Sequence, residues 1–189
     1  MRLTAEQHAV NQCNESKLIV NAFAGAGKTT TLEAFARNHP NKRMLYLAFN
    51  KAVQLEAAER FPSNVEARTT HSLAMSAIGK RYSKKLISRL RLPSIIEALG
   101  LPRDYRLAEQ VHEVLVNFLG SAVTDISQLI DPLQENRQFL ADCAQRLWQL
   151  MCEPNDDRIG MLHDGYLKLF QMGTSNNPTF WHYSGVSRP

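Results

Sequence analysis

Short apolar runs alternate with helical patterns over the first 70 residues of the chain. Segments 17–22 and 44–48 are short apolar runs of the kind found in strands covered on both faces, and 65–70 is a shorter strand candidate. Segments 28–38 and 52–60 have the composition and apolar spacing of helices. Strands and helices in this alternation predict βαβ units, and therefore an α/β fold with a parallel sheet.

The pattern changes beyond Ser72, where helical stretches follow one another and prolines such as Pro93 and Pro102 separate them. The predicted helices cover 72–80, 84–92, 94–99, 107–119, 138–152 and 165–171. We therefore expect the second half to be all-helical. From Gly173 onward the sequence has no periodicity, and we expect this stretch to be poorly ordered.

The first residues predict a helix with a capped start. Thr4 is placed as the N-cap, and Gln7 follows three residues later in the capping-box arrangement.

Length and composition indicate a globular chain without a membrane segment. Its 189 residues, 44% of them hydrophobic, suit one domain, or one domain with an insertion. No apolar run reaches the roughly 20 residues of a membrane helix, and the first residues do not resemble a signal peptide. Cys13, Cys143 and Cys152 form no C-x-x-C pair, which is typical of reduced thiols. We expect a cytoplasmic protein, associated with the nucleoid if it is bacterial, and the sequence predicts no oligomeric state.

Positive charge is concentrated in one part of the chain. Residues 37–91 hold twelve basic and three acidic side chains, although the net charge of the whole chain is only +4. The densest part is 80–91, which contains no acidic residue. Such a run forms either a solvated helix face or a surface for a polyanion such as nucleic acid, whose phosphates release counterions when cations bind them.

The segment 22–29 has the form of a phosphate-binding loop with alanine in place of the first glycine. Gly27 allows a close backbone approach, Lys28 reaches the β- and γ-phosphates, and the Thr29 hydroxyl can ligate Mg²⁺. The helix that follows directs its positive end at the anion. The residues predicted to surround the nucleotide phosphates are Ala24, Gly25, Ala26, Gly27, Lys28, Thr29 and Thr30. The alternative is a glycine-rich turn with an incidental lysine; a dinucleotide fingerprint is excluded because the third glycine is absent.

Gln7 lies 21 residues before Lys28. Its amide can donate to N7 and accept from N6 of adenine, and would thereby discriminate adenine from guanine. The alternative is that Gln7 serves only as a capping residue.

Polar and aromatic residues follow the second and third predicted strands. Phe49, Asn50 and Lys51 stand at the carboxyl end of the second strand, where ligands of open parallel sheets bind. Stacking on an aromatic ring beside phosphate contacts is typical of single-strand binding. The alternative places Phe49 in the core. Thr70 closes the third predicted strand and His71 follows it, and no spacing of Cys and His residues suggests a metal site.

Together these segments resemble the amino-terminal end of superfamily 1 helicases of the UvrD/Rep type, in particular the F-box DNA helicase branch and its bacterial relatives. Residues 3–7 look like the Q motif, 22–30 like motif I, 48–52 like motif Ia and 69–73 like motif Ib. The segment 163–170 looks like the exit from the helical subdomain that this branch inserts. The resemblance covers about residues 1–171.

The resemblance implies an incomplete P-loop NTPase (RecA-like) sheet with an inserted all-helical subdomain. It places the amino-terminal part of an ATP-binding domain at 1–79, the inserted subdomain at 80–171 and a divergent tail at 172–189. The implied activity is ATP-driven 3′-to-5′ translocation on single-stranded DNA, or at a single-strand/duplex junction. Lys28 and Thr29 would hold the ATP phosphates and Mg²⁺, and Gln7 the adenine. The residues that would contact the DNA strand are Phe49, Asn50, Lys51, Thr70 and His71.

The same resemblance implies residues that this sequence lacks. In the family an apolar strand ends in Asp-Glu, and a second RecA-like domain supplies arginine fingers, which are worth roughly 10³–10⁵ in rate. Asp156 and Asp157 do not follow an apolar strand and do not replace that motif. We therefore expect a truncated or frameshifted product that binds ATP and DNA weakly without unwinding.

Two other functions stay open from the residues alone. One is a small-molecule P-loop kinase, in which Arg137, Arg146 and Arg158 would form a lid. The other is a non-enzymatic DNA-binding remnant that uses the basic stretch 80–91.

Overall fold

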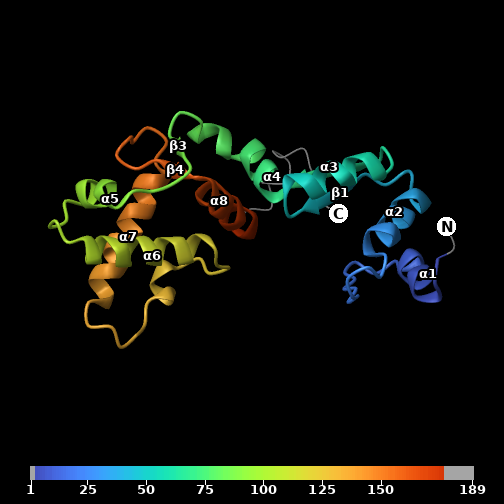
Figure 1. Ribbon diagram of the computed structural model, residues 1–189, viewed down its shortest axis with the longest axis horizontal. Coiled ribbons are helices and arrows are strands. Elements are labelled where there is room, and N and C mark those ends of the chain that lie inside the picture. Colours follow the sequence, from blue (N-terminus) through green and yellow to red (C-terminus); the bar gives the residue numbers. More distant parts are fainter. Residues whose placement is uncertain (1–2, 177–189) are drawn as a thin grey trace. The chain divides into compact units, whose positions relative to one another are not determined.

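Two separately packed units make up the chain in the computed structural model, which describes residues 3–176 (Figure 1). The first unit ends at Thr70 and the second begins at His71. The assignment of 1–79 to an ATP-binding domain stays a prediction.

A parallel strand pair with its crossover helix organises the first unit. Strand β1 (Met44–Ala48) leads into helix α3 (Lys51–Arg60), and the chain returns as β2 (Val65–Thr69). Met44 pairs with Val65 and Ala48 with Thr69, so both strands end at the same edge. The predicted βαβ unit is confirmed here, and with it a mixed α/β architecture with a parallel sheet.

Helices α1 (Ala5–Gln12) and α2 (Lys28–Asn38) pack against each other in the same unit. The predicted capping box at α1 is confirmed: the Gln7 backbone N–H donates to Thr4 Oγ1 at 3.3 Å, and the Thr4 N–H donates to Gln7 Oε1 at 3.0 Å. These bonds satisfy two N–H groups at the start of the helix.

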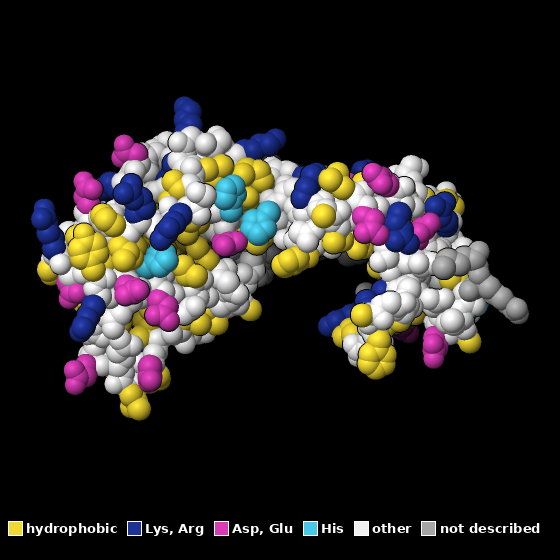
Figure 2. Space-filling model, in the orientation of Figure 1, with side chains coloured by type: hydrophobic (Ala, Val, Ile, Leu, Met, Phe, Trp, Pro, Cys, Tyr) yellow, Lys and Arg dark blue, Asp and Glu magenta, His cyan; other side chains and the backbone are white. Residues whose placement is uncertain are grey.

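The prediction of a buried strand over 17–22 is wrong in this structure. The segment has no strand assignment, and Ile19 is 72% exposed. Figure 2 shows hydrophobic side chains at the surface over the loop between α1 and α2. A strand needs a neighbour for its backbone donors and acceptors. Within residues 3–70, β1 and β2 pair with each other and no third strand joins them.

The second unit is mostly helical and contains the larger core. Its elements are α4 (Thr70–Ala77, which begins at the unit boundary), η1 (Gly79–Tyr82), β3 (Leu86–Ile87), α5 (Leu92–Leu99), α6 (Tyr105–Leu119), η2 (Ile126–Leu129), α7 (Arg137–Cys152), β4 (Met161–Leu162) and α8 (His163–Asn176). Helices α6 and α7 cross at the centre of this unit (Figure 1). Phe118 on α6 and Trp148 on α7 meet edge to face, with ring centroids 5.4 Å apart.

The prediction of a helix over 84–92 and of an all-helical second half is wrong. Residues Leu86 and Ile87 form a short parallel pair with Met161 and Leu162. Gly160 allows this pairing, because a Cβ there would lie 2.5 Å from the Ile87 side chain. Among the exposed charges of the segment, Leu86 and Ile87 are half-buried and pack against the core of the unit, which favours an extended backbone over a helix.

The carboxyl end of the described chain also differs from expectation. Helix α8 continues to Asn176, so residues 173–176, predicted to be poorly ordered, are helical. The rest of the predicted tail, 177–189, lies outside the described residues. Between residues 3 and 176, no helix combines the length and apolar character needed to span a membrane.

Candidate functional site

The loop that precedes α2 folds as two turns stabilised by glycine. Gly25 and Gly27 have φ values of 77° and 79°, a left-handed conformation that side chains disfavour. Gly27 is the N-cap of α2, and its carbonyl accepts from the Thr31 N–H at 2.9 Å and from the Thr31 hydroxyl at 2.9 Å. The loop therefore directs the chain sharply into the start of a helix.

Lys28 folds back over this loop. Its Nζ donates to the carbonyl oxygens of Ala22 at 3.1 Å and Phe23 at 2.8 Å. Both residues are exposed, as is Lys28 itself. The ammonium group is thus held beside the loop by weak, solvent-accessible contacts that an incoming anion can replace.

Several backbone donors of the loop have no acceptor. In the described part of the chain, no hydrogen bond is recorded for the N–H groups of Gly25, Gly27, Lys28, Thr29 and Thr30. Unpaired N–H groups at the start of a helix, together with the helix dipole, favour an anion. The donor set fits a phosphate group, and the half-buried Thr29 hydroxyl stands in the first turn of α2, where it could serve Mg²⁺.

Gln7 reaches this loop from α1. Its Nε2 donates to the Ala26 carbonyl at 3.5 Å, and a Cβ on Gly27 would lie 3.0 Å from the same nitrogen. Gln7 therefore caps its own helix and also contacts the loop. The capping role is confirmed, and the adenine contact stays a prediction.

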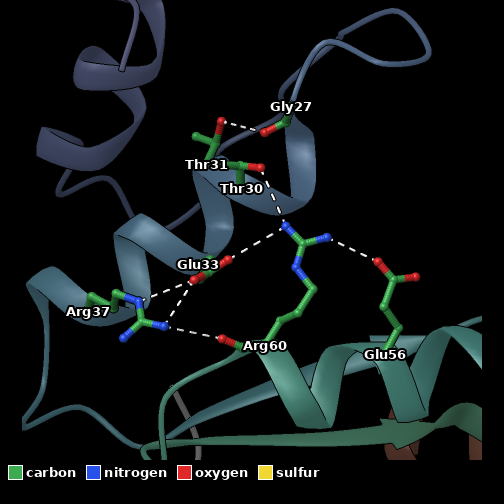
Figure 3. A network of polar contacts seen from close by, with 7 residues as sticks. All are labelled: Gly27, Thr30, Thr31, Glu33, Arg37, Glu56 and Arg60. Atoms are coloured by element: carbon green, nitrogen blue, oxygen red, sulfur yellow. Dashed lines mark hydrogen bonds and ion pairs between the residues drawn. The ribbon is translucent and has the colours of Figure 1, made fainter. Parts of the chain in front are cut away.

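An ion-pair network fixes α2 against α3 (Figure 3). Arg60 pairs with Glu56 at 3.0 Å and with Glu33 at 3.6 Å, and its Nη2 lies 3.5 Å from the Thr30 hydroxyl. Arg37 joins through Glu33 at 3.0 Å. Arg60 thus orients the first turns of α2. Sequence reasoning missed this residue, although the i,i+4 pairs Glu33–Arg37 and Glu56–Arg60 signal charged helix faces.

Only some of the residues predicted to contact DNA lie together at one edge of the sheet. Phe49 and Thr70 directly follow Ala48 and Thr69, which are register partners. Phe49 is 92% exposed, so the alternative that it lies in the core is wrong. Asn50 caps α3, since its Oδ1 accepts from the Val53 N–H at 2.9 Å.

Lys51 and His71 already have partners of their own. The Lys51 Nζ donates to Gln54 Oε1 at 2.7 Å. His71 begins the second unit, where its Nε2 lies 3.0 Å from Asp164 Oδ1. Sequence reasoning did not find Asp164 as a partner, because the two residues are 93 positions apart.

No metal site is evident from clustered side chains. Between residues 3 and 176, no group of three or more His, Cys, Asp or Glu side chains could hold an ion. Two of the arginines named for a kinase lid have partners within the second unit: Arg137 donates to the Ser127 carbonyl at 3.2 Å and Arg158 pairs with Asp156. Arg146 is exposed on α7.

Comparison with known proteins finds similarity to two DNA helicases. F-box DNA helicase 1 of chicken (Gallus gallus) is 30% identical over 197 aligned residues, which cover 91% of this chain. F-box DNA helicase protein 1 of Schizosaccharomyces pombe is 28% identical over 197 aligned residues, which cover 90% of it. The chain is similar to F-box DNA helicases.

The similarity to F-box DNA helicases supports a helicase family relationship. The chain spans about a fifth of the length of these curated relatives, 20% and 22%. No family model and no solved structure matches the chain.

Proposed function

We propose that this chain is the amino-terminal ATP-binding part of a UvrD/Rep-type DNA helicase that moves 3′ to 5′ along single-stranded DNA. The observation that carries the proposal is the loop before α2, where Lys28 and a set of unpaired N–H groups surround one turn. Such a loop suits a triphosphate, and the similarity to F-box DNA helicases makes ATP the expected nucleotide.

Each residue has a defined part in the proposal. Lys28 holds the β- and γ-phosphates, Thr29 contributes a hydroxyl to Mg²⁺, and Gln7 reads adenine. Mg²⁺ supplies charge neutralisation for the phosphates when it is bound. Phe49 offers an exposed ring on which a base can stack. The DNA strand passes beside Asn50, Lys51, Thr70 and His71. The protein works in the cytoplasm on DNA with a single-stranded region.

We further propose that the chain alone binds ATP and DNA without unwinding. The sequence contains no apolar strand ending in Asp-Glu, so no carboxylate pair is available to hold the metal and orient water. No second P-loop-type domain is present among its residues to supply arginine fingers, and such fingers are worth roughly 10³–10⁵ in rate.

Titration with a fluorescent ATP analogue, with and without unlabelled single-stranded DNA, tests this function. We expect Mg²⁺-dependent binding whose affinity changes about 5-fold or more when DNA is present, because linked sites affect each other reciprocally. Phosphate release should stay at background.

Three outcomes would contradict the proposal. Robust DNA-stimulated hydrolysis would show that the isolated chain is active. Transfer of the γ-phosphate to a metabolite would favour a kinase, and DNA binding without any nucleotide binding would favour a non-enzymatic remnant.

A further inference from the structure

A basic hollow opens on the second unit beside the segment that connects β3 to α5. Its volume is about 360 Å³, and four exposed cationic side chains line it: Lys84, Arg89, Arg91 and Arg158. A single carboxylate, that of Asp157, lines it as well. In the described part of the chain, the side chains of Lys84, Arg89 and Arg91 form no recorded hydrogen bond or ion pair. Gathered cations without partners repel one another, and an anion among them relieves that repulsion.

The wall of the hollow is held by a half-buried lysine. The Lys85 Nζ donates to three carbonyl oxygens, those of Leu150 at 3.0 Å, Glu153 at 2.8 Å and Asp156 at 2.6 Å. Burial lowers the pKa of Lys85, and its charge is directed at these carbonyls instead of at the hollow. Lys85 therefore fixes the loop after α7, on which Asp157 and Arg158 stand.

Arg158 is itself held in place. Its Nε donates to both Asp156 carboxylate oxygens, at 3.0 and 3.1 Å. The hydrogen bonds from Arg158 lower the pKa of Asp156 to about 2, so this pair stays ionised at any physiological pH. One cation of the hollow is thus pre-positioned, which reduces the entropic cost of binding an anion there.

A second hollow of about 760 Å³ adjoins the first and shares Arg89 and Arg91 with it. Tyr105 and His112 line this second hollow, together with the carboxylate of Glu109. Tyr105 is 56% exposed, so its ring can receive a stacked base. In Figure 2, Lys and Arg side chains lie in the region of α5, with acidic and hydrophobic side chains between them.

We propose that the two hollows together form a second binding site for single-stranded DNA, which we call the basic groove and define by Lys84, Arg89, Arg91, Tyr105 and Arg158. A backbone phosphate occupies the smaller hollow, and a neighbouring base stacks on Tyr105 in the larger one. The proposal rests on the proposed function, because it names a further contact for the same DNA. It places the DNA strand on residues that lie outside the helicase motifs.

Fluorescence anisotropy of a labelled oligonucleotide of about 20 thymidines, with the full chain and no nucleotide, tests the groove. The double substitution Arg89→Ala and Arg91→Ala should raise the Kd about 10-fold and reduce the slope of log K against log salt by about 0.7, since the contact with the one phosphate in the smaller hollow is lost. Tyr105→Ala should raise the Kd about 5-fold with an unchanged salt slope, because stacking releases no counterions.

The matched control is the double substitution Arg103→Ala and Arg106→Ala. Both residues are exposed near the start of α6, neither lines a hollow, and the net charge changes equally. The control should keep the Kd within about twofold. Equal losses in the two double variants would overturn the groove, as would an effect of the arginines with none of Tyr105. Inorganic phosphate that displaces the DNA at constant ionic strength would show a small-anion site instead.

The outcome is separable from that of the proposed function. If the wild-type chain fails to bind Mg–ATP, the proposed function fails, while the thymidine oligonucleotide still reports on the groove. If it binds Mg–ATP but the groove variants bind DNA as the control does, only the groove is overturned.

Discussion

Replacing Lys28 by alanine is expected to weaken the binding of Mg–ATP about 10- to 100-fold, because a hydrogen bond to a charged group contributes about 1.5–3 kcal/mol. Without a ligand the Lys28 Nζ donates only to the carbonyls of Ala22 and Phe23, two exposed residues whose oxygens water can satisfy. The substitution should therefore leave the fold intact. Isothermal titration calorimetry with Mg–ATP measures the effect.

The matched control for this variant is Lys42→Ala. Lys42 is exposed in the same unit, and its side chain has no recorded partner in the described part of the chain. The control should bind Mg–ATP as the wild type does. A Lys28→Ala chain that binds as tightly as the control would mean that the lysine is incidental to the turn.

Replacing Lys168 by alanine is expected to lower the free energy of unfolding by about 3–5 kcal/mol. Lys168 is 1% exposed; its Nζ donates to the carbonyls of Ser121 at 2.9 Å and Val123 at 2.6 Å and lies 4.3 Å from the centroid of the Phe118 ring. Alanine leaves two carbonyls without this donor and removes the buried stem. Burial also lowers the pKa of Lys168.

Urea denaturation followed by circular dichroism measures this effect. Lys168→Met retains most of the stem and should lose less stability than Lys168→Ala, while Lys80→Ala changes an exposed lysine and should stay within about 0.5 kcal/mol of the wild type. If Lys168→Ala costs no more than Lys80→Ala, the buried lysine does not hold the turn between α6 and η2.

Local patterns predicted most of the first unit. The capping box at Thr4 and Gln7, helix α2 and the β1–α3–β2 crossover all depend on neighbouring residues, and the structure contains each of them. The strand expected at 17–22 failed because apolar character alone does not provide a partner strand. A strand is a property of the sheet as much as of its own residues.

In the second unit, the charge of a side chain did not show whether that side chain is exposed to solvent. Residues 84–92 look like a solvated helix, yet Lys85 donates to carbonyls 65 to 71 positions away. Lys168 likewise bonds carbonyls 45 and 47 positions away. Carbonyl acceptors carry no signature in the sequence, since every residue has one. Only the folded chain reveals which lysines they bind.

Some features of the candidate site likewise follow from consecutive residues, whereas others depend on how the chain folds. The turn at Gly27 and the start of α2 could be predicted, because their residues are consecutive in the sequence. Phosphate binding by this loop stays a prediction. The contact of Gln7 with the loop depends on how α1 packs against α2, and spacing only suggested it. The pairing of His71 with Asp164 could not be predicted from residues 93 positions apart.

The central claim is that the backbone amides between Gly25 and Thr29 enclose the phosphates of ATP. A ¹H–¹⁵N nuclear magnetic resonance titration of the wild-type chain with Mg–ATP tests it directly. The account predicts that the largest shift changes fall on the amides of Gly25, Gly27, Lys28 and Thr29, and that the Gln7 side-chain amide shifts with Mg–ATP and not with Mg–GTP. Saturable shifts confined to other residues, or no shifts at all, would contradict it.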